Sequence, residues 1–305
     1  MDPDRLADSY SDTNPFFRLF RHMGWGALVN LGYYTIPTLP ALLGGVAFFQ
    51  RRLETRCLEL LQARPGHRVL DACCGRGHTT ARLGAAGCSA VGVDISGQQI
   101  AQARSRYGAA PNTAFAVADV TALPGQASGF PVADRPFDRI HCLEAAFHLS
   151  PAGRRALLAE AFRVLRPGGR LVLVDFTWRT ADPDTIHGLD PRGLLRAAWQ
   201  IEGFEPLTRY LVHAEAAGFR VSRTVDWTRP VVERSLRLGA VLSRMAASRG
   251  GREVLGLRWA GLREFTEQDW QTTIATIDAH QSVGRGVGYS ALVLDKPGAE
   301  GGRAR

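Results

Sequence analysis

The sequence has very little lysine and no long hydrophobic run, and its basic residues and apolar segments together argue against some classes of protein. Lys296 is the one lysine among 37 basic residues, so arginine supplies almost all of the formal net charge of +8. The arginines are scattered singly, without the basic clusters and interleaved aromatic residues that typify nucleic-acid binding, and we interpret them as a solvated surface. No apolar run reaches the roughly 18 residues that a membrane span needs. We therefore expect no nucleic-acid partner and no integral contact with a membrane.

Cysteine is also scarce and lacks the spacing of a disulfide framework or a zinc site. The five cysteines, Cys57, Cys73, Cys74, Cys88 and Cys142, are an odd number dispersed over 305 residues. No CxxC pair is present, so we expect no bound metal. The acidic, polar start MDPDRLADSY lacks the basic and apolar segments of a secretory signal. These features together favour a cytoplasmic location.

The sequence does contain a regular alternation of short apolar strands and helices. We expect strands at 67–72, 90–94, 114–119, 137–143 and 170–175, with helices at 79–86, 98–107 and 153–165. This alternation predicts a parallel sheet with helices on both faces. Beyond it we expect an irregular stretch at 179–205, a helix at 207–217, a strand at 219–227, several helices over 231–280 and a last strand at 288–296.

This pattern divides the chain into four parts. Residues 1–60 are predicted to form a helical lid segment and residues 61–178 the ligand-binding core. Residues 179–297 are predicted to complete the core sheet and to add helical lid insertions, and 298–305 (GAEGGRAR) to be a disordered tail.

A glycine-containing loop follows the first predicted strand in the segment VLDACCGRG, residues 69–77. The strand ends near Asp71, and Gly75 and Gly77 lie in the tight turn before the next helix. In open α/β sheets, ligands bind beyond the carboxyl ends of the strands. Taken alone, this loop sequence is equally consistent with a tight turn that binds no ligand. A nicotinamide dinucleotide site is disfavoured, because Thr80 occupies the third position of the GxGxxG pattern.

Acidic residues recur at the ends of the first four predicted strands. Asp71, Asp94, Asp119 and Glu144 are separated by 23, 25 and 25 residues, which is about the length of one strand–helix unit. Any one of these acids is more often a helix cap, but four in register indicate one ligand-binding edge. Asp94 is placed to bind both hydroxyls of a ribose, and Asp119 to accept a hydrogen bond from an adenine amino group.

With these acids, the segments resemble the motifs of class I S-adenosylmethionine-dependent methyltransferases. The segments are VLDACCGRG, GVDIS, VADV, FDRIHCLEAAFHL and LRPGGRLVLVDF, and the likeness extends over roughly residues 30–297. The final GYSALVLDKP resembles the antiparallel last strand of that fold. The resemblance implies an α/β, Rossmann-like, seven-stranded, mostly parallel sheet with helices on both faces, a helical N-terminal segment and an insertion lid. It also implies S-adenosyl-L-methionine as the cofactor.

The resemblance carries over to particular positions of this chain. The implied cofactor-binding residues are Tyr33, Asp71, Ala72, Cys73, Gly75, Gly77, Asp94, Ile95, Gln99, Asp119, Val120 and Leu143. Cys73 departs from the family pattern, which usually has glycine there.

Two further segments resemble the group that methylates small molecules. In NLGYY, residues 30–34, Tyr33 would lie against the methionine part of the cofactor, although two core tyrosines are an equal alternative. In EAAFH, the acid Glu144 precedes His148, and a histidine with an ordinary pKa of about 6.5 suits proton removal. Asp175 is a candidate to orient that histidine. The alternative for His148 is a packing role beneath the following helix.

We therefore predict methyl transfer to a small molecule, a secondary metabolite or lipid, with His148, Glu144 and Asp175 as candidate catalytic residues. The acceptor is expected in an apolar pocket roofed by the 179–280 insertion and the first 40 residues. The sequence does not determine whether the acceptor atom is oxygen, nitrogen or carbon. It also does not determine the oligomeric state, for which a homodimer is one possibility. The alternatives are an NAD(P)-dependent oxidoreductase and a non-catalytic cofactor-binding protein.

Overall fold

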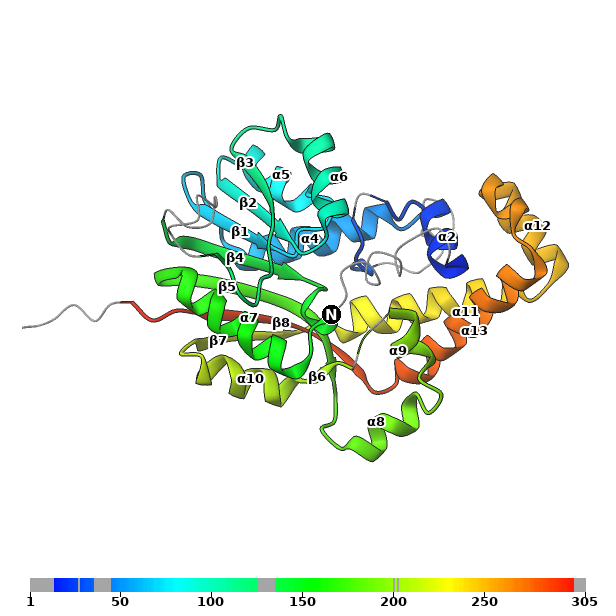
Figure 1. Cartoon of the computed structure of the whole chain (residues 1–305). Coiled ribbons are helices and arrows are strands. Elements are labelled where there is room, and N and C mark those ends of the chain that lie inside the picture. The colour runs from blue at the N-terminus through cyan, green and yellow to red at the C-terminus, as the bar shows by residue number, and fades with distance from the viewer. Residues whose placement is uncertain are drawn as a thin grey trace, which may run out of the picture. The chain divides into compact units, whose positions relative to one another are not determined.

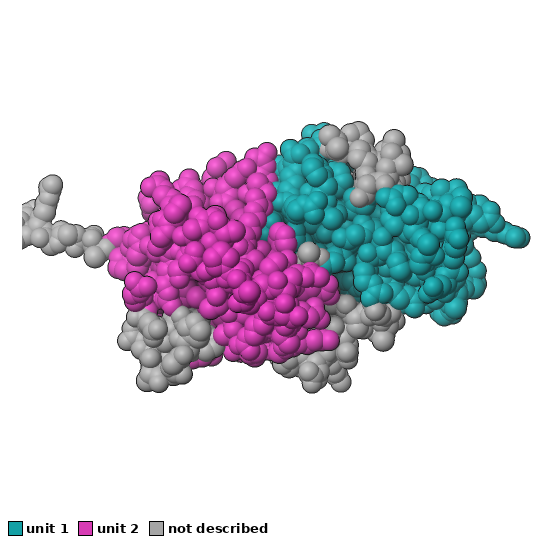
Figure 2. Space-filling model, turned by 90° about the horizontal axis from the view of Figure 1, so that it is seen from above, with its two compact units in different colours: residues 1–54, 176–206, 226–289 teal, residues 55–175, 207–225, 290–305 magenta. Residues whose placement is uncertain are grey.

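The computed structural model describes residues 14–26, 28–35, 45–124, 135–199, 201 and 203–298. The chain divides into two compact units, shown in teal and magenta in Figure 2. Unit 1 comprises 1–54, 176–206 and 226–289, and unit 2 comprises 55–175, 207–225 and 290–305. Apart from Gly298, the predicted disordered tail lies outside the described residues.

Unit 2 contains most of one mixed sheet (Figure 1). Its strands are β1 (Arg68–Ala72), β2 (Ser89–Asp94), β3 (Thr113–Val117), β4 (Phe137–Leu143), β5 (Leu165–Trp178), β7 (Arg220–Asp226) and β8 (Val287–Asp295). They are ordered β3-β2-β1-β4-β5-β8-β7, and the two-residue β6 (Glu205–Pro206) pairs with the end of β5. The last residues of β5 and the first residues of β8 belong to unit 1.

The direction of the strands confirms the predicted fold class. β1 to β5 pair in parallel, for example Leu70 with Val91. β8 runs antiparallel to β5, because the Lys296 amide donates to the Gly169 carbonyl at one end of the pair (2.9 Å). At the other end, the Arg179 amide donates to the Gly286 carbonyl (2.9 Å).

Two of the helices of unit 2 begin at serine side chains that cap them. The helices of this unit are α5 (His78–Ala85), α6 (Gly97–Tyr107), α7 (Pro151–Val164), α10 (Leu207–Ala216) and the end of α4 (Ala47–Leu61). Ser96 caps α6 by accepting from the Gln99 amide, and Ser150 caps α7 by accepting from the Gly153 amide. Each cap fixes where the chain turns from the sheet edge into a helix.

Unit 1 is largely helical around an aromatic core. Its elements include α2 (Pro15–His22), α8 (Pro183–Leu189), α9 (Leu194–Trp199), η3 (Arg229–Glu233), α11 (Arg234–Ala246), α12 (Arg249–Arg258), η4 (Ala260–Glu264) and α13 (Glu267–Val283). The Trp199 indole donates to His280 Nε2 (2.6 Å), and His280 stacks on Phe16. Because an indole nitrogen can only donate, His280 is neutral and carries its proton on Nδ1, which donates to the Thr276 carbonyl.

One expectation about this unit is wrong. The stretch 179–205 was expected to be irregular, but it contains α8 and α9. Asp182 accepts from the Thr185 amide (3.0 Å), and Pro183 occupies the first turn of α8. This Asp-Pro pair is a helix-start signal. The several helices expected over 231–280 are confirmed. No helix among the described residues combines the length and apolar character that crossing a membrane requires.

Candidate cofactor site

The four predicted acids lie at or next to the carboxyl ends of neighbouring strands. Asp71 is the penultimate residue of β1, Asp94 is the last residue of β2, and Glu144 directly follows β4. Asp119 comes two residues after β3, which ends earlier than expected, at Val117. The parallel order β3-β2-β1-β4 therefore gathers these positions along one sheet edge.

Asp71 points into the protein. Its carboxylate is buried, accepts from the Thr80 hydroxyl (2.7 Å) and contacts His141 Nδ1 (2.8 Å). These contacts tie β1 to α5 and to β4, so Asp71 anchors the loop that follows it. Sequence reasoning missed His141 entirely and used Thr80 only as an argument against a dinucleotide site. Nothing local in the sequence connects Asp71 with His141, 70 residues away.

The loop after β1 has left-handed backbone at three positions, Cys73 (φ +59°), Gly75 (φ +52°) and Gly77 (φ +79°). A Cβ on Gly77 would lie 2.6 Å from the Phe115 ring, so this glycine is required for packing. A Cβ on Gly75 would meet nothing within 4 Å, so one side of the loop is open at that residue. Left-handed backbone at Cys73 explains in physical terms why glycine is usual there.

The two adjacent cysteines of the loop are held as neutral thiols. A hydrogen bond with the Cys142 thiol, together with burial, raises the pKa of Cys73. Burial is the main cause that raises the pKa of Cys74. Thiolates are the reactive form, so these cysteines belong to the structure of the loop.

Asp94 connects the end of β2 to the glycine loop. Its Oδ2 accepts from the Gly75 amide (3.0 Å) and its Oδ1 from the Ser96 amide (2.9 Å). Burial raises the pKa of this carboxyl despite both hydrogen bonds. The Ile95 amide also donates to this carboxylate. A carboxylate has about four acceptor sites, so acceptor capacity remains for a hydroxyl of a ligand. Close by on α6, Gln99 Oε1 is buried and has no hydrogen-bond partner among the residues that the structure describes.

The next loop along the edge is built on Asp119, which is exposed. Its Oδ1 accepts from both the amide (2.8 Å) and the hydroxyl (2.7 Å) of Thr121. The predicted apolar contacts are placed around these acids: Ala72 and Val120 are buried, and Ile95 and Leu143 are half-buried. The edge thus presents the carboxylates of Asp94 and Asp119 together with two half-buried apolar side chains, Ile95 and Leu143.

The connection from β4 to α7 carries the predicted catalytic residues. Glu144 has left-handed backbone (φ +48°), and its amide donates to the Val174 carbonyl. A single turn, η2 (Ala146–His148), follows. Arg154 on α7 is 2% exposed and donates from Nε to the Ala146 carbonyl (3.2 Å) and from Nη2 to the Phe147 carbonyl (3.4 Å). Arg154 therefore fixes this turn, a role that sequence reasoning missed.

His148 lies at the end of this turn with its ring 4.0 Å from the Phe147 ring, centroid to centroid. Burial lowers the pKa of His148 to about 3. The ordinary pKa expected from the sequence is therefore wrong, because the surrounding protein disfavours the charged ring. Asp175 is buried in β5 and accepts a hydrogen bond from the Tyr210 hydroxyl (3.3 Å).

Tyr33 belongs to unit 1, whereas the other predicted site residues belong to unit 2. It is half-buried, and its ring meets Trp227 edge to face, with centroids 5.7 Å apart. Tyr34 is buried and stacks on Phe49. The NLGYY segment thus contains one core tyrosine and one that keeps part of its surface exposed.

Comparison with known proteins now bears on this site. Residues 69–169 match the family model of a methyltransferase domain. An O-methyltransferase of Pyrenophora dematioidea is 31% identical over 248 residues, covering 75% of this chain and 85% of that protein. The chain belongs to the S-adenosylmethionine-dependent methyltransferases.

Two further comparisons concern a methyltransferase of similar sequence and a structure of similar fold. The 27-O-demethylrifamycin SV methyltransferase of Amycolatopsis mediterranei is 28% identical over 81% of this chain and 83% of its own length. The structure of the cyclase SpnF shares the fold, with a TM-score of 0.66 and 20% identity over 92% of this chain and 93% of that one. Other curated methyltransferases are matched over 45% to 64% of their length. The enzyme class and cofactor predicted from the sequence are confirmed.

Proposed function

We propose that this methyltransferase methylates a hydroxyl oxygen of a small secondary metabolite. The main support for the cofactor site is the Asp94 carboxylate, which lies at the sheet edge and accepts a hydrogen bond from the Gly75 amide. The acceptor half is supported by the relatives, which are named an O-methyltransferase and a methyltransferase of 27-O-demethylrifamycin SV.

The residues at the edge fit the proposed cofactor. Asp94 would accept both ribose hydroxyls, and Asp119 would accept from the adenine amino group. The open side of Gly75 leaves room for a ligand against the backbone, and Gln99 offers an acceptor to it. S-adenosylmethionine, when bound, supplies an electrophilic methyl group on a sulfonium.

His148 stays a candidate catalytic residue, but its lowered pKa makes it a weaker proton acceptor than the general base expected from the sequence. As a neutral ring it would accept a hydrogen bond from the acceptor hydroxyl and orient its oxygen. Glu144 stays a candidate catalytic residue, and Asp175 stays a candidate to orient His148. The placement of Tyr33 at the methionine end, the apolar acceptor pocket, the homodimer, the cytoplasmic location and the four-part division of the chain also stay predictions.

The test is calorimetry with S-adenosylhomocysteine and, separately, NADPH. We expect Asp94→Ala to weaken S-adenosylhomocysteine binding at least about tenfold, because losing a charged acceptor costs about 1.5–3 kcal/mol. Asp184→Ala, which removes an exposed carboxylate at the start of α8, is the matched control and should bind normally. Unchanged affinity in Asp94→Ala, or tighter binding of NADPH, would overturn the cofactor assignment.

Methyl transfer to an acceptor must be tested by a separate assay, because the same fold also occurs in a cyclase. Wild-type protein with labelled cofactor should transfer label to hydroxylated small molecules in a screen of secondary metabolites. Cofactor binding without transfer to any oxygen, nitrogen or carbon acceptor would favour the non-catalytic alternative.

A further inference from the structure

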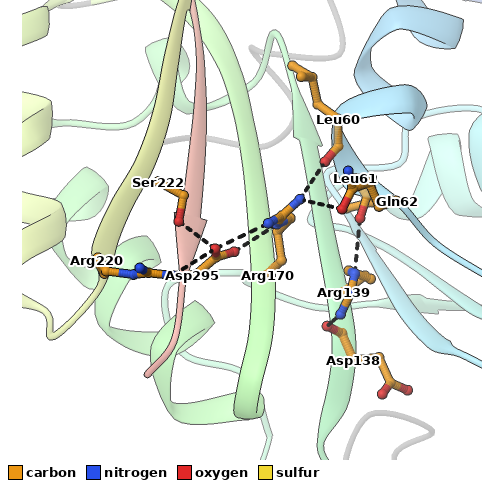
Figure 3. Close-up of polar contacts among 9 residues, drawn as sticks. All are labelled: Leu60, Leu61, Gln62, Asp138, Arg139, Arg170, Arg220, Ser222 and Asp295. Carbon is orange, nitrogen blue, oxygen red and sulfur yellow. Dashed lines mark hydrogen bonds and ion pairs between the residues drawn. The ribbon is translucent and has the colours of Figure 1, made fainter. Parts of the chain in front are cut away.

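A basic hollow lies in unit 2 near the starts of strands β4 and β5, away from the acids at their carboxyl ends. Figure 3 shows the polar contacts of four residues that line it, Arg139, Arg170, Arg220 and Asp295. Its volume is about 390 Å³. The charged residues that line it are Arg139, Arg170, Arg220, Lys296 and Asp295. Four cations therefore surround this hollow against a single carboxylate.

Part of this charge has a structural role at helix ends. Arg139 Nε donates to the Leu61 carbonyl (3.0 Å) and Arg170 Nη1 to the Leu60 carbonyl (3.3 Å), both in the last turn of α4. Lys296 Nζ donates to two carbonyls at the end of α7 (both 2.7 Å). The carboxyl end of a helix carries about half a negative charge, so α4 and α7 together offset about one cation.

The single carboxylate is committed to two of the arginines. Asp295 accepts from Arg170 through both oxygens (2.7 and 3.1 Å) and lies 3.7 Å from the Arg220 guanidinium. Arg139 and Lys296 form no ion pair with any carboxylate in the described part of the chain. Both are half-buried, and burial, with repulsion from neighbouring Arg170 and Arg166, lowers the pKa of Arg139.

Four cations, one carboxylate and two helix ends leave about two positive charges uncompensated in this hollow. We propose that it binds a phosphate-type dianion, either free phosphate or the phosphoryl group of a small monoester. Arg139 Nη1 also donates to the Asp138 carbonyl (2.8 Å), so Arg139 would hold the anion mainly through Nη2 and Lys296 through its third N–H group. Partial burial makes such charged hydrogen bonds stronger than exposed ones. This inference does not depend on the proposed methyl acceptor.

The experiment measures the rise in melting temperature of the whole chain with inorganic phosphate, with glycerol phosphate and with sodium chloride at matched ionic strength. Isothermal calorimetry then gives the affinities. We expect both phosphates to stabilise the wild type more than chloride does. A response to inorganic phosphate alone would identify free phosphate as the ligand.

Variants test whether the hollow is the site. Arg139→Gln combined with Lys296→Gln should weaken phosphate binding about tenfold or more. Arg249→Gln removes one of the two charges that the double variant removes, from an exposed position on α12, and should bind normally. Asp295→Asn removes the internal carboxylate and should bind phosphate more tightly, a gain that loss of folding cannot produce. Phosphate acting no better than chloride, equal losses in Arg249→Gln, or weaker binding in Asp295→Asn would overturn the proposal.

Discussion

The lowered pKa of His148 leads to a prediction about both stability and mechanism. Its pKa of about 3 means that the ring is neutral at every pH at which the enzyme is expected to work. Turnover of the wild type should therefore show no ionisation near pH 6–7 that belongs to this residue. A neutral ring that only accepts a hydrogen bond contributes about 0.5–1.5 kcal/mol, so His148→Ala should slow turnover by about two- to tenfold. His148→Asn should keep most of the activity, because its amide oxygen also accepts.

The same shift sets how stability depends on pH. A histidine whose pKa is depressed on folding contributes stability that is complete above its unfolded pKa of about 6.5 and is lost as pH falls toward the folded value. The loss approaches about 1.4 kcal/mol for each pH unit below 6.5. Between pH 6.5 and 4.5, His148 should cost the wild type about 2–3 kcal/mol that His148→Asn, which cannot be protonated, does not lose.

Urea unfolding of both proteins at pH 7, 6, 5 and 4.5 measures this difference directly. Other buried histidines, such as His280, titrate in both proteins and cancel in the comparison. Parallel stability curves over this range would show that the ring is not desolvated. A kinetic ionisation near pH 6–7 that disappears in His148→Asn, with a loss of activity of 10²-fold or more, would instead establish an ordinary general base.

Two further predictions concern the loops that hold the site. Gly75→Ala should lower S-adenosylhomocysteine affinity at least about tenfold and lower the free energy of unfolding by only about 1 kcal/mol. Gly77→Ala should lower the free energy of unfolding by about 3 kcal/mol or more, because its Cβ would clash with Phe115. Calorimetry measures the affinity and thermal unfolding the stability, and normal binding by Gly75→Ala would contradict the proposed site. Arg154→Met should lower the free energy of unfolding by about 2–5 kcal/mol, because it removes a donor from two buried carbonyls. A denaturation curve within about 1 kcal/mol of the wild type would show that Arg154 does not hold the turn.

The strands of the core could be predicted closely because each depends on a short apolar run bounded by turn residues. β4 occupies the predicted residues 137–143, and β2 differs by one residue at its start. β5 is longer than the strand expected at 170–175: it begins at Leu165 and continues through Pro167 and its neighbouring glycines. Pairing with β8 explains this difference, since the amide of Gly168 donates to the Lys296 carbonyl (3.0 Å), a partner remote in sequence.

The site could be predicted only where its residues are close in sequence or follow a regular spacing. The register of the acids follows from the repeat of strand and helix, so Asp94 could be assigned without a structure. His141 and Tyr210 could not, because their partners lie 70 and 35 residues away. Arg154 is intermediate: it occupies the same helical face as Leu157 and Leu158, and this spacing distinguishes it from its exposed neighbour.

The two edges of the unit 2 sheet carry opposite charges, and the direction of the helices explains both. Helices that cross between parallel strands begin at the carboxyl edge and end at the amino edge. The beginnings of α5 and α6 therefore lie near Asp94, where the positive ends of the helix dipoles favour carboxylates. The ends of α4 and α7 are negative and collect Arg139, Arg170 and Lys296. Interpreting the arginines only as a solvated surface was thus incomplete, because some of them cap helices. One helix end offsets about half a charge, so these three cations carry more positive charge than the two helix ends neutralise. An anion bound in the hollow would neutralise the remaining positive charge.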